Sequence, residues 1–470
     1  MSRRSFLALP GCAAALLGAA QPARPPLNVV FILADDLGAC DLGVYGADLH
    51  ETPNLDRLAR SSVRFTSAYA AAPVCTPTRA SIQTGKYPAR LHMTIWHEAA
   101  AKPPQNRRSI PPVVEGDLPH REVTIAERLH ELGYLTAHVG KWHLGEASYF
   151  PETQGFDINI GGAHWGAPQT FFFPYRGSKL FGGEPRYVPH LEWGEPGEYL
   201  TDRFTTEALK IVSRAKDRPF YLNLCYHTVH TPIEAKEEIV KRYQAKIRPG
   251  LNHRNATFAA MVHSLDENVG RLLDGLEKAG VADRTLVVFT SDNGGYIGRF
   301  GGETVTNNFP LRSGKGSLYE GGIRVPLIVR WPGVTPAGAL CGEPVISNDF
   351  HTTITEAAGF GPQRGTDGVS LVPLLRSPSA RLPRQDLFFH YPHYYETTSP
   401  VSAVRSRAWK LLEYLEDGRL ELYNLERDPR EERNLAQEMP ERARELLDKL
   451  RRWRASVDAQ MPVSNPKAGG

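Results

Sequence analysis

One short segment of the chain carries residues that could bind an anionic group and attack it. It contains Cys75, followed by Pro77 and Arg79. Proline suits the first turn of a helix, because its missing N–H would be unpaired there in any case. Cys75 would then lie at the helix start, where free N–H groups and the helix dipole bind anions and lower the pKa of a thiol. Arg79, about one turn further on, would offer a planar, permanently charged group to the oxygens of a sulfate or phosphate.

Polar residues of complementary kinds follow four apolar runs elsewhere in the chain. The runs are rich in β-branched and aromatic residues, as expected of strands that are buried on both faces. They cover residues 27–34, 134–139, 219–226 and 286–290. The polar residues that follow them are Asp35 and Asp36, Lys141 and His143, His227 and His230, and Asp292 and Asn293. Ligands of open α/β sheets bind outside the carboxyl ends of parallel strands, so these residues are expected to meet around one site.

The expected site is a cation bound beneath an anionic group. Carboxylate and amide oxygens suit a hard cation such as Ca²⁺ or Mg²⁺. The expected cation ligands are Asp35, Asp36, Asp292 and Asn293. The residues expected to hold the anion are Arg79, Lys141, His143 and Lys315. Zinc is disfavoured at the pair formed by His227 and His230, because no further soft ligands lie near it in sequence.

Two of these segments match family signatures at every fixed position. The pattern C-x-P-x-R-x-x-x-x-T-G begins at Cys75, and G-Y-x-T-x-x-x-G-K-W-H-x-G covers residues 133–145. The chain therefore resembles the type I sulfatases of the alkaline phosphatase superfamily, and among them the exported bacterial polysaccharide sulfatases. Residues 320–326, which follow Lys315, resemble the same family.

The resemblance implies a specific chemistry. Cys75 would be oxidised by a formylglycine-generating maturation enzyme and hydrated, and would also bind the Ca²⁺ ion (or Mg²⁺ in its place). One hydroxyl, deprotonated with help from Asp292, would attack sulfur in line, and His230 with Lys315 would protonate the departing alcohol. Loss of the second hydroxyl's proton to His143 would then release sulfate. The catalytic residues implied are Cys75, Arg79, Lys141, His143, His230 and Lys315.

The resemblance also implies an α/β fold with a large, mainly parallel sheet flanked by helices. This catalytic domain would cover residues 27–377. Helices are expected after Thr52, after the capping box that begins at Thr124, and over residues 259–279. A smaller α+β subdomain over 384–460 would contain strands at 404–412 and 420–424 and a helix at 440–454, with a tail over 461–470.

A sulfated saccharide is the expected substrate. Residues 150–200 are rich in Gly, Pro and aromatic residues and are expected to form a long loop, of the kind that is often functional. The substrate contacts expected are Trp165, His227 and His393. The segment 390–395, at the start of the C-terminal subdomain, would either close over the site or pack between the domains.

Composition, charge and the N-terminal segment indicate the expected location of the protein and the partners that are disfavoured. Of the 470 residues, 41% are hydrophobic and 23% charged, and the formal charge of +3 is too small to favour nucleic acid or an anionic membrane as a partner. Residues 1–20 contain Arg3 and Arg4 ahead of a short apolar run and small residues, the pattern of a twin-arginine export signal. The run is too short to span a bilayer, so no stable membrane insertion is expected and the protein is expected in the periplasm or outside the cell. The alternative is lipid attachment at Cys12, within a segment that resembles a lipobox.

Three other functions remain open. Phosphonate monoester or phosphodiester hydrolases of the same superfamily share the C-x-P-x-R pattern and formylglycine. A sulfated-glycan binder without activity would leave Cys75 unmodified. A plain metal-dependent phosphatase is disfavoured, because those relatives have Ser or Thr in place of Cys75.

Overall fold

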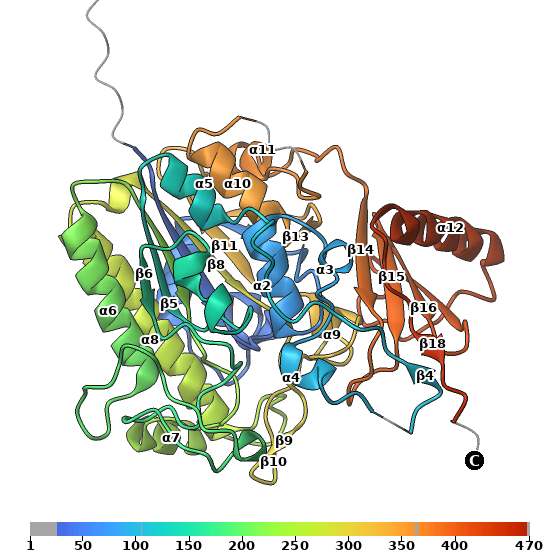
Figure 1. Cartoon of the computed structure of the whole chain (residues 1–470), viewed down its shortest axis with the longest axis horizontal. Coiled ribbons are helices and arrows are strands. Elements are labelled where there is room, and N and C mark those ends of the chain that lie inside the picture. The colour runs from blue at the N-terminus through green and yellow to red at the C-terminus, as the bar shows by residue number, and fades with distance from the viewer. Residues whose placement is uncertain (1–25, 105, 362–364, 468–470) are drawn as a thin grey trace, which may run out of the picture.

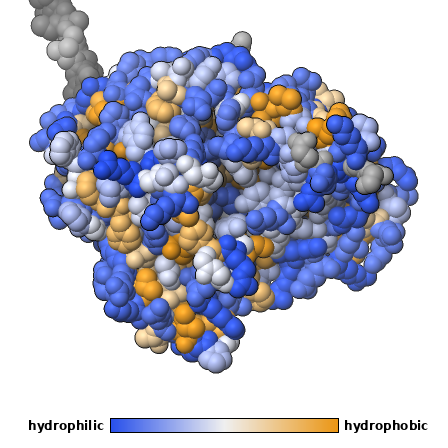
Figure 2. Space-filling model, turned by 60° about the horizontal axis from the view of Figure 1, so that its bottom comes forward, coloured by the Kyte–Doolittle hydropathy of each residue, from blue (hydrophilic) through white to orange (hydrophobic). Residues whose placement is uncertain are grey.

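The computed structural model describes residues 26–104, 106–361 and 365–467 (Figure 1). The predicted export signal over residues 1–20 and the lipobox at Cys12 lie outside the described residues. Among the residues that are described, no helix is long and apolar enough to cross a membrane. The face shown in Figure 2 is mostly hydrophilic, and its apolar residues lie in small separate groups.

An eight-stranded sheet forms the centre of the larger part of the molecule, in the order β12-β2-β11-β8-β1-β7-β5-β6. The strands are β1 (Asn28–Ala34), β2 (Val63–Phe65), β5 (Leu135–Gly140), β6 (Ile158–Ile160), β7 (Phe220–Cys225), β8 (Thr285–Ser291), β11 (Leu327–Arg330) and β12 (Ala339–Cys341). All neighbours pair in parallel except β11, which is antiparallel to both β2 and β8. This arrangement, with the smaller antiparallel sheet described below, confirms the predicted fold class.

Side chains of β1 alternate between two hydrophobic cores, one on each face of the sheet. Val30 and Ile32 pack in the core beneath α6 and α8, whereas Val29 and Phe31 pack in the core beneath α2, α5 and α10 (Figure 1). The first core is covered by α1 (Pro53–Arg60), α6 (Leu200–Ala215) and α8 (Ala256–Lys278). The second is covered by α2 (Cys75–Thr84), α5 (Ile125–Glu131), α10 (Asp349–Ala357) and α11 (Val372–Arg376). A strand buried on both faces must be apolar throughout, which is why these runs are visible in the sequence.

The predicted helix starts agree with the structure. Helix α1 begins at Pro53, and α5 follows Thr124, whose side chain accepts from the Glu127 N–H while the Glu127 carboxylate accepts from the Thr124 N–H. Helix α8 begins three residues before the predicted 259. The remaining short helices are α3 (Pro88–Leu91), α4 (His97–Ala100), α7 (Glu237–Gln244) and α9 (Glu320–Ile323).

Residues 150–200 form an irregular segment, as predicted, but it also contributes the edge strand β6 to the main sheet. Three two-stranded pairings of the described chain lie outside the two larger sheets. Two of them are β3 (Ala68–Tyr69) with β13 (Val345–Ile346), and β9 (Arg299–Phe300) with β10 (Glu303–Thr304).

The C-terminal part is a four-stranded antiparallel sheet with one helix packed on it (Figure 1). Its elements are β14 (Asp386–Tyr391), β15 (Val401–Ser406), β16 (Trp409–Tyr414), β17 (Leu420–Asn424) and α12 (Pro440–Ser456). The prediction of a single strand over 404–412 is wrong, because the chain turns at Arg407, which has a φ of 54°, and forms the β15–β16 hairpin. No Gly, Pro or Asn marks this turn, so the usual turn signal is missing from the sequence.

Part of the predicted tail is also paired with the rest of the molecule. Strand β18 (Val463–Ser464) is antiparallel to β4 (Ser109–Ile110). The predicted domain limits of 27–377 and 384–460 remain predictions, although the two sheets are separate in space (Figure 1).

A buried ion-pair network joins the two parts. Lys410 on β16 is fully buried, and its Nζ lies 2.9 Å from Glu320 Oε1 and 2.8 Å from Glu431 Oε1. Burial opposes ionisation of Glu320, but Lys410 and Arg324 outweigh it and lower its pKa to about 2. Lys410 is therefore the nearest cation to two buried carboxylates, with Arg324 further away, 3.6 Å from Glu320.

Lys410→Met is expected to lower the free energy of unfolding by about 3–5 kcal/mol, because it leaves buried carboxylates without their cation. Urea unfolding followed by circular dichroism measures this change. Lys449→Met is the matched control, because Lys449 pairs with Asp386 at a partly exposed position and its loss is expected to cost less than about 1 kcal/mol. Equal losses in the two variants would contradict the prediction.

Candidate active site

The four strands that carry the predicted site residues are neighbours in the sheet, in the order β8-β1-β7-β5. Their carboxyl ends are aligned by register, with Leu33 opposite Cys225 and Ala34 opposite Ser291. Backbone hydrogen bonds continue just beyond the strands, where the Lys141 N–H donates to the Cys225 carbonyl at 2.8 Å. Residues more than 250 positions apart in the chain are thereby brought to one edge of the sheet.

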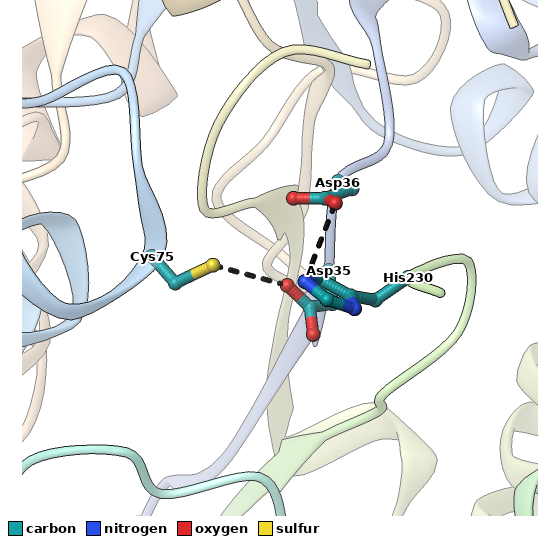
Figure 3. Close-up of side chains that lie close together, drawn as sticks. All are labelled: Asp35, Asp36, Cys75 and His230. Atoms are coloured by element: carbon teal, nitrogen blue, oxygen red, sulfur yellow. Dashed lines mark hydrogen bonds and ion pairs between the residues drawn. The ribbon is translucent and has the colours of Figure 1, made fainter. Parts of the chain in front are cut away.

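Cys75 is the first residue of α2, with Pro77 in the first turn as predicted. Its Sγ lies 3.5 Å from Asp35 Oδ1 (Figure 3). The prediction that the helix start lowers the pKa of the thiol is wrong. Burial raises the pKa of Cys75 to about 12, despite the nearby cations Lys141 and Lys315. An unmodified Cys75 is therefore a protonated thiol, which is a poor nucleophile.

The acidic residues form a compact cluster beside Cys75. Ligand atoms of Asp35, Asp36, Cys75 and His230 all lie within 4.8 Å of one another (Figure 3). Asp292 joins the cluster by accepting the Asp36 N–H at 3.2 Å. His230 was not among the predicted metal ligands, and its Nε2 lies 3.6 Å from Asp36 Oδ2.

Two observations show that this cluster fits a divalent cation. The Oδ1 atom of Asn293 is buried and has no hydrogen-bond partner within the described chain, while its Nδ2 donates to Asp36 Oδ1 at 2.8 Å. Burial also raises the pKa of Asp35 to about 7, because the charged form is poorly solvated here. A cation bound by these oxygens would satisfy Asn293 and favour ionised Asp35.

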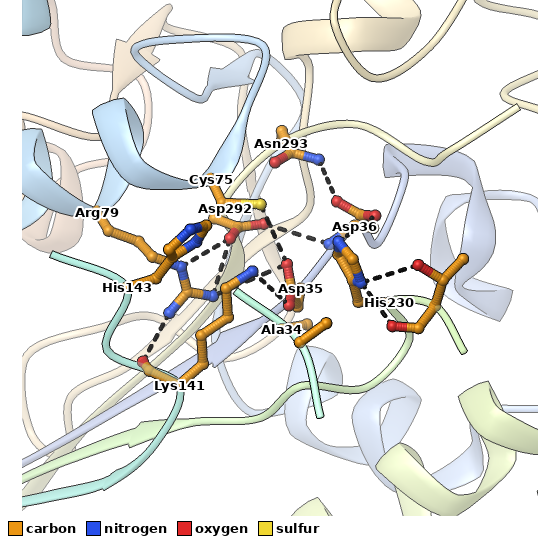
Figure 4. Close-up of polar contacts among 12 residues, drawn as sticks. Ala34, Asp35, Asp36, Cys75, Arg79, Lys141, His143, His230, Asp292 and Asn293 are labelled. Carbon is orange, nitrogen blue, oxygen red and sulfur yellow. Dashed lines mark hydrogen bonds and ion pairs between the residues drawn. The ribbon is translucent and has the colours of Figure 1, made fainter. Parts of the chain in front are cut away.

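Each acidic side chain is paired with a cation of the predicted anion-binding set, and Figure 4 shows the pairs made by Arg79 and Lys141. The pairs and their shortest N–O distances are Arg79 Nε with Asp292 Oδ2 at 2.8 Å, Lys141 Nζ with Asp35 Oδ2 at 2.7 Å, and Lys315 Nζ with Asp36 Oδ1 at 2.8 Å. Burial opposes ionisation of Asp36 and Asp292, but these cations outweigh it and lower the pKa of both. Arg79 also donates to the Lys141 carbonyl at 2.9 Å, so the two signature segments are held together directly.

The histidines at the site are neutral. Burial lowers the pKa of His143 to about 4, and burial together with Lys315 lowers that of His230 to about 3. The Nε2 atom of His143 lies 3.4 Å from Glu98 Oε2, whereas its Nδ1 is buried without a partner among the described residues. Both rings reach the same cavity as Cys75.

A cavity of about 510 Å³ opens above these groups. Of the predicted site residues, it is lined by Asp36, Cys75, His143, His230 and Lys315. Sequence reasoning missed most of the rest of its wall, which combines aromatic and charged side chains. These missed residues are Trp96, Glu98, Phe181, Arg186, Tyr296, Arg299, Phe300 and Tyr395.

Some of the missed residues had a signal in the sequence. Phe181 and Arg186 belong to the aromatic segment 150–200, and Tyr395 ends the segment 390–395 that was expected near the site. Trp96 and Glu98 lie on or beside α4, with no motif to mark them. Only their position beside the cavity identifies them.

The three predicted substrate contacts lie elsewhere. Trp165 is 2% exposed and stacks on the buried ring of His227, with ring centroids 5.3 Å apart. His393 is buried, and its Nε2 lies 2.8 Å from Thr94 Oγ1. Within the described chain, none of the three lines the cavity, although Gly166 and Ala167, which follow Trp165, do.

The large sheet, the smaller antiparallel sheet and the site at the strand ends define an alkaline-phosphatase-like α/β fold. The sulfatase family model matches residues 27–360, and the model described as N-sulphoglucosamine sulphohydrolase, C-terminal, matches residues 313–456. The chain belongs to the sulfatase family and is a sulfuric ester hydrolase.

The similarity to known proteins extends over most of the chain. A sulfatase of Formosa agariphila is 33% identical over 91% of this chain and 88% of its own length. The N-acetylgalactosamine-6-sulfatase of Canis lupus familiaris is 34% identical over 77% of this chain and 68% of its own. The crystal structure of Ps i-CgsB in complex with k-i-k-neocarrahexaose has a TM-score of 0.77 and 29% identity, covering 94% of this chain and 96% of that one.

Proposed function

We propose that this sulfatase removes sulfate from a sulfated carbohydrate, using Cys75 converted to formylglycine and one bound Ca²⁺ ion. The observation that carries this proposal is the position of Cys75, with its Sγ 3.5 Å from Asp35 and its side chain at the wall of a cavity. The relatives named above support the carbohydrate, because one is named for an N-acetylgalactosamine sulfate and another is bound to an oligosaccharide.

The residues around Cys75 have distinct roles in this proposal. When bound, Ca²⁺ would supply positive charge next to the sulfate oxygens, and formylglycine would supply the attacking oxygen. Asp35, Asp36, Asp292 and Asn293 would hold the ion. Arg79, Lys141 and Lys315 stabilise negative charge on the sulfuryl group, and they are already held in place by their carboxylate partners.

The groups that line the cavity would carry out proton transfer. His230 and Lys315 both contact Asp36, so together they can deliver a proton to the departing alcohol. A bound sulfate would offset the charge of Lys315 and so favour the protonated form of His230. Release of sulfate from the enzyme would require the second hydroxyl to lose its proton. His143 would accept that proton, because its Nδ1 has no other partner in the described structure.

The cavity wall suits a sugar. Aromatic side chains such as Trp96, Phe181 and Tyr395 offer flat apolar faces, and Arg186 and Arg299 offer charge for an anionic substituent. These residues replace Trp165 and His393 as the proposed substrate contacts. His227 is proposed to pack behind His230 instead of touching substrate.

Two measurements test this function. Activity against a panel of sulfated oligosaccharides is compared with activity against an aryl sulfate and an aryl phosphodiester. Cleavage of sulfate from at least one oligosaccharide supports the proposal, whereas a large preference for the phosphodiester would assign the site to phosphodiester or phosphonate ester hydrolysis. Mass spectrometry of the Cys75 peptide shows whether the thiol has become the aldehyde, and an unconverted Cys75 would favour a binding protein without activity.

Removal of the metal is expected to reduce kcat/KM by at least about 100-fold, because metal charge is worth several kcal/mol in such transition states. The protein is dialysed against a chelator, and the activity and the bound metal are both measured. Adding Ca²⁺ is expected to restore activity, and restoration by Mg²⁺ alone would identify Mg²⁺ as the ion. Full activity in protein that retains no stoichiometric metal would contradict the proposal.

We also propose that the protein is exported to the periplasm or beyond the cell, with residues 1–20 removed. N-terminal sequencing of protein recovered from a bacterial periplasm tests this. A start near residue 21 is expected, and a lipid attached at Cys12 would favour the alternative.

A further inference from the structure

A second group of metal-ligating side chains lies outside the active site. Asp41 ends the 3-10 helix η1 (Ala39–Asp41), His50 lies in the loop before α1, and His253 lies just before α8. All three side chains are buried, with exposed fractions of 0%, 4% and 3% respectively. The cluster connects the segment that follows β1 with the start of α8, the longest helix described, which begins about 200 residues later in the chain.

The distances between the donor atoms match those of a tetrahedral metal site. Asp41 Oδ1 lies 3.6 Å from His50 Nδ1 and 3.4 Å from His253 Nε2, and one ligand atom from each residue lies within 4.8 Å of the others. Two ligands bound to Zn²⁺ at about 2.0–2.1 Å and separated by the tetrahedral angle are themselves about 3.3–3.4 Å apart. The two distances from Asp41 Oδ1 are therefore close to the spacing of ligands around one tetrahedral ion.

His253 is oriented as a metal-bound histidine usually is. Its Nδ1 lies 2.8 Å from Asp48 Oδ1, and metal-binding histidines commonly donate their second ring N–H to a carboxylate in this way. Its Nε2 is buried 3.4 Å from Asp41 Oδ1 and has no hydrogen-bond partner within the described residues. The ring is thus fixed by Asp48 with an unsatisfied nitrogen directed at the two other ligands.

The two remaining ligands differ in how readily they could bind an ion. Asp41 Oδ2 accepts the Gly38 N–H at 2.8 Å, and Oδ1 accepts the Thr306 hydroxyl at 2.9 Å, which leaves a further lone pair on Oδ1. His50 Nδ1 donates to the Asp41 main-chain oxygen at 3.0 Å, so zinc would have to displace this hydrogen bond and bind the ring with its proton on Nε2.

We propose that Asp41, His50 and His253 bind one Zn²⁺ ion, with Asp48 as a positioning residue for His253. Two imidazole nitrogens and one carboxylate favour zinc over the hard cation expected at Asp35 and Asp36. The ion ties the segment that follows the catalytic acids to the start of α8. The site is independent of the reaction catalysed at Cys75.

The experiment uses the full chain, stripped of metal and then kept in excess Ca²⁺ so that the acidic site at Asp35 and Asp36 is occupied. Zn²⁺ is added, unbound metal is removed, and the metal content is measured by mass spectrometry. One equivalent of zinc is expected in the wild-type chain and none in His50→Gln or His253→Gln. His263→Gln is the matched control, because His263 is a buried histidine of α8 that bonds Tyr243 and lies outside the cluster.

Two further measurements keep the proposal testable if one variant fails to fold. Co²⁺ added in place of zinc is expected to give the visible absorption of a tetrahedral site in the wild type and in His263→Gln, and none in His50→Gln. Asp48→Asn keeps all three ligands and is expected to weaken zinc binding by about 10–100-fold. A wild-type chain that retains no zinc, or equal zinc in the wild type and both ligand variants, overturns the proposal and leaves His253 as a histidine placed between Asp41 and Asp48.

Discussion

Cys75→Ser is expected to release at most one equivalent of alcohol per molecule of enzyme and then to stop. A serine hydroxyl occupies the position of the attacking oxygen, among the same cations Arg79, Lys141 and Lys315. It can therefore accept the sulfuryl group, but it has no second hydroxyl whose deprotonation would expel sulfate. Rapid-quench measurement of the alcohol released from an aryl sulfate distinguishes a single burst from continuous turnover.

Cys341→Ser is the matched control for this variant. Cys341 is also a buried free cysteine, but it lies on β12, away from the cavity. Its replacement is expected to leave kcat unchanged in the folded protein. Continuous turnover by Cys75→Ser would show that a single hydroxyl suffices, and the formylglycine proposal would then fail.

His230→Gln is expected to lower kcat/KM by about 10²–10⁴-fold for sulfate esters of sugars or simple alcohols, because these leaving groups need a proton. For 4-nitrophenyl sulfate, whose phenolate leaves without one, the loss is expected to be small. The position of His230 supports this role, because its ring lines the cavity and its Nε2 lies 3.6 Å from Asp36 Oδ2, beside Lys315. Steady-state kinetics with both kinds of substrate give the ratio of wild-type to variant kcat/KM for each leaving group.

The comparison between leaving groups separates acid catalysis from simple damage to the site. Equal losses for the two substrates would assign His230 to substrate binding or to cation binding. His120→Gln serves as the control, since His120 is an exposed histidine that stacks on Tyr149 and is expected to change neither ratio.

The residues predicted to carry the chemistry could be located from the sequence alone, because each lies in a recognisable local segment. Cys75 and Arg79 lie about one turn apart on α2, and Asp35 and Asp36 directly follow an apolar strand. Strands buried on both faces are apolar throughout, so their ends can be located, and the rule for parallel sheets then brings those ends together. Helices with a capping box, such as α5, were equally visible.

The tertiary structure alone decided everything that depends on contacts between distant segments. The wall of the cavity comes from several loops, so Trp96 and Tyr395 became site residues only when the chain was folded. The raised pKa of Cys75 depends on burial, which the position of a helix start does not reveal. The pairing of Asp41 with His253 joins residues more than 200 positions apart, and no spacing rule connects them. Local sequence sets local conformation and ligand type, whereas the partners of a buried side chain are set by how whole elements pack.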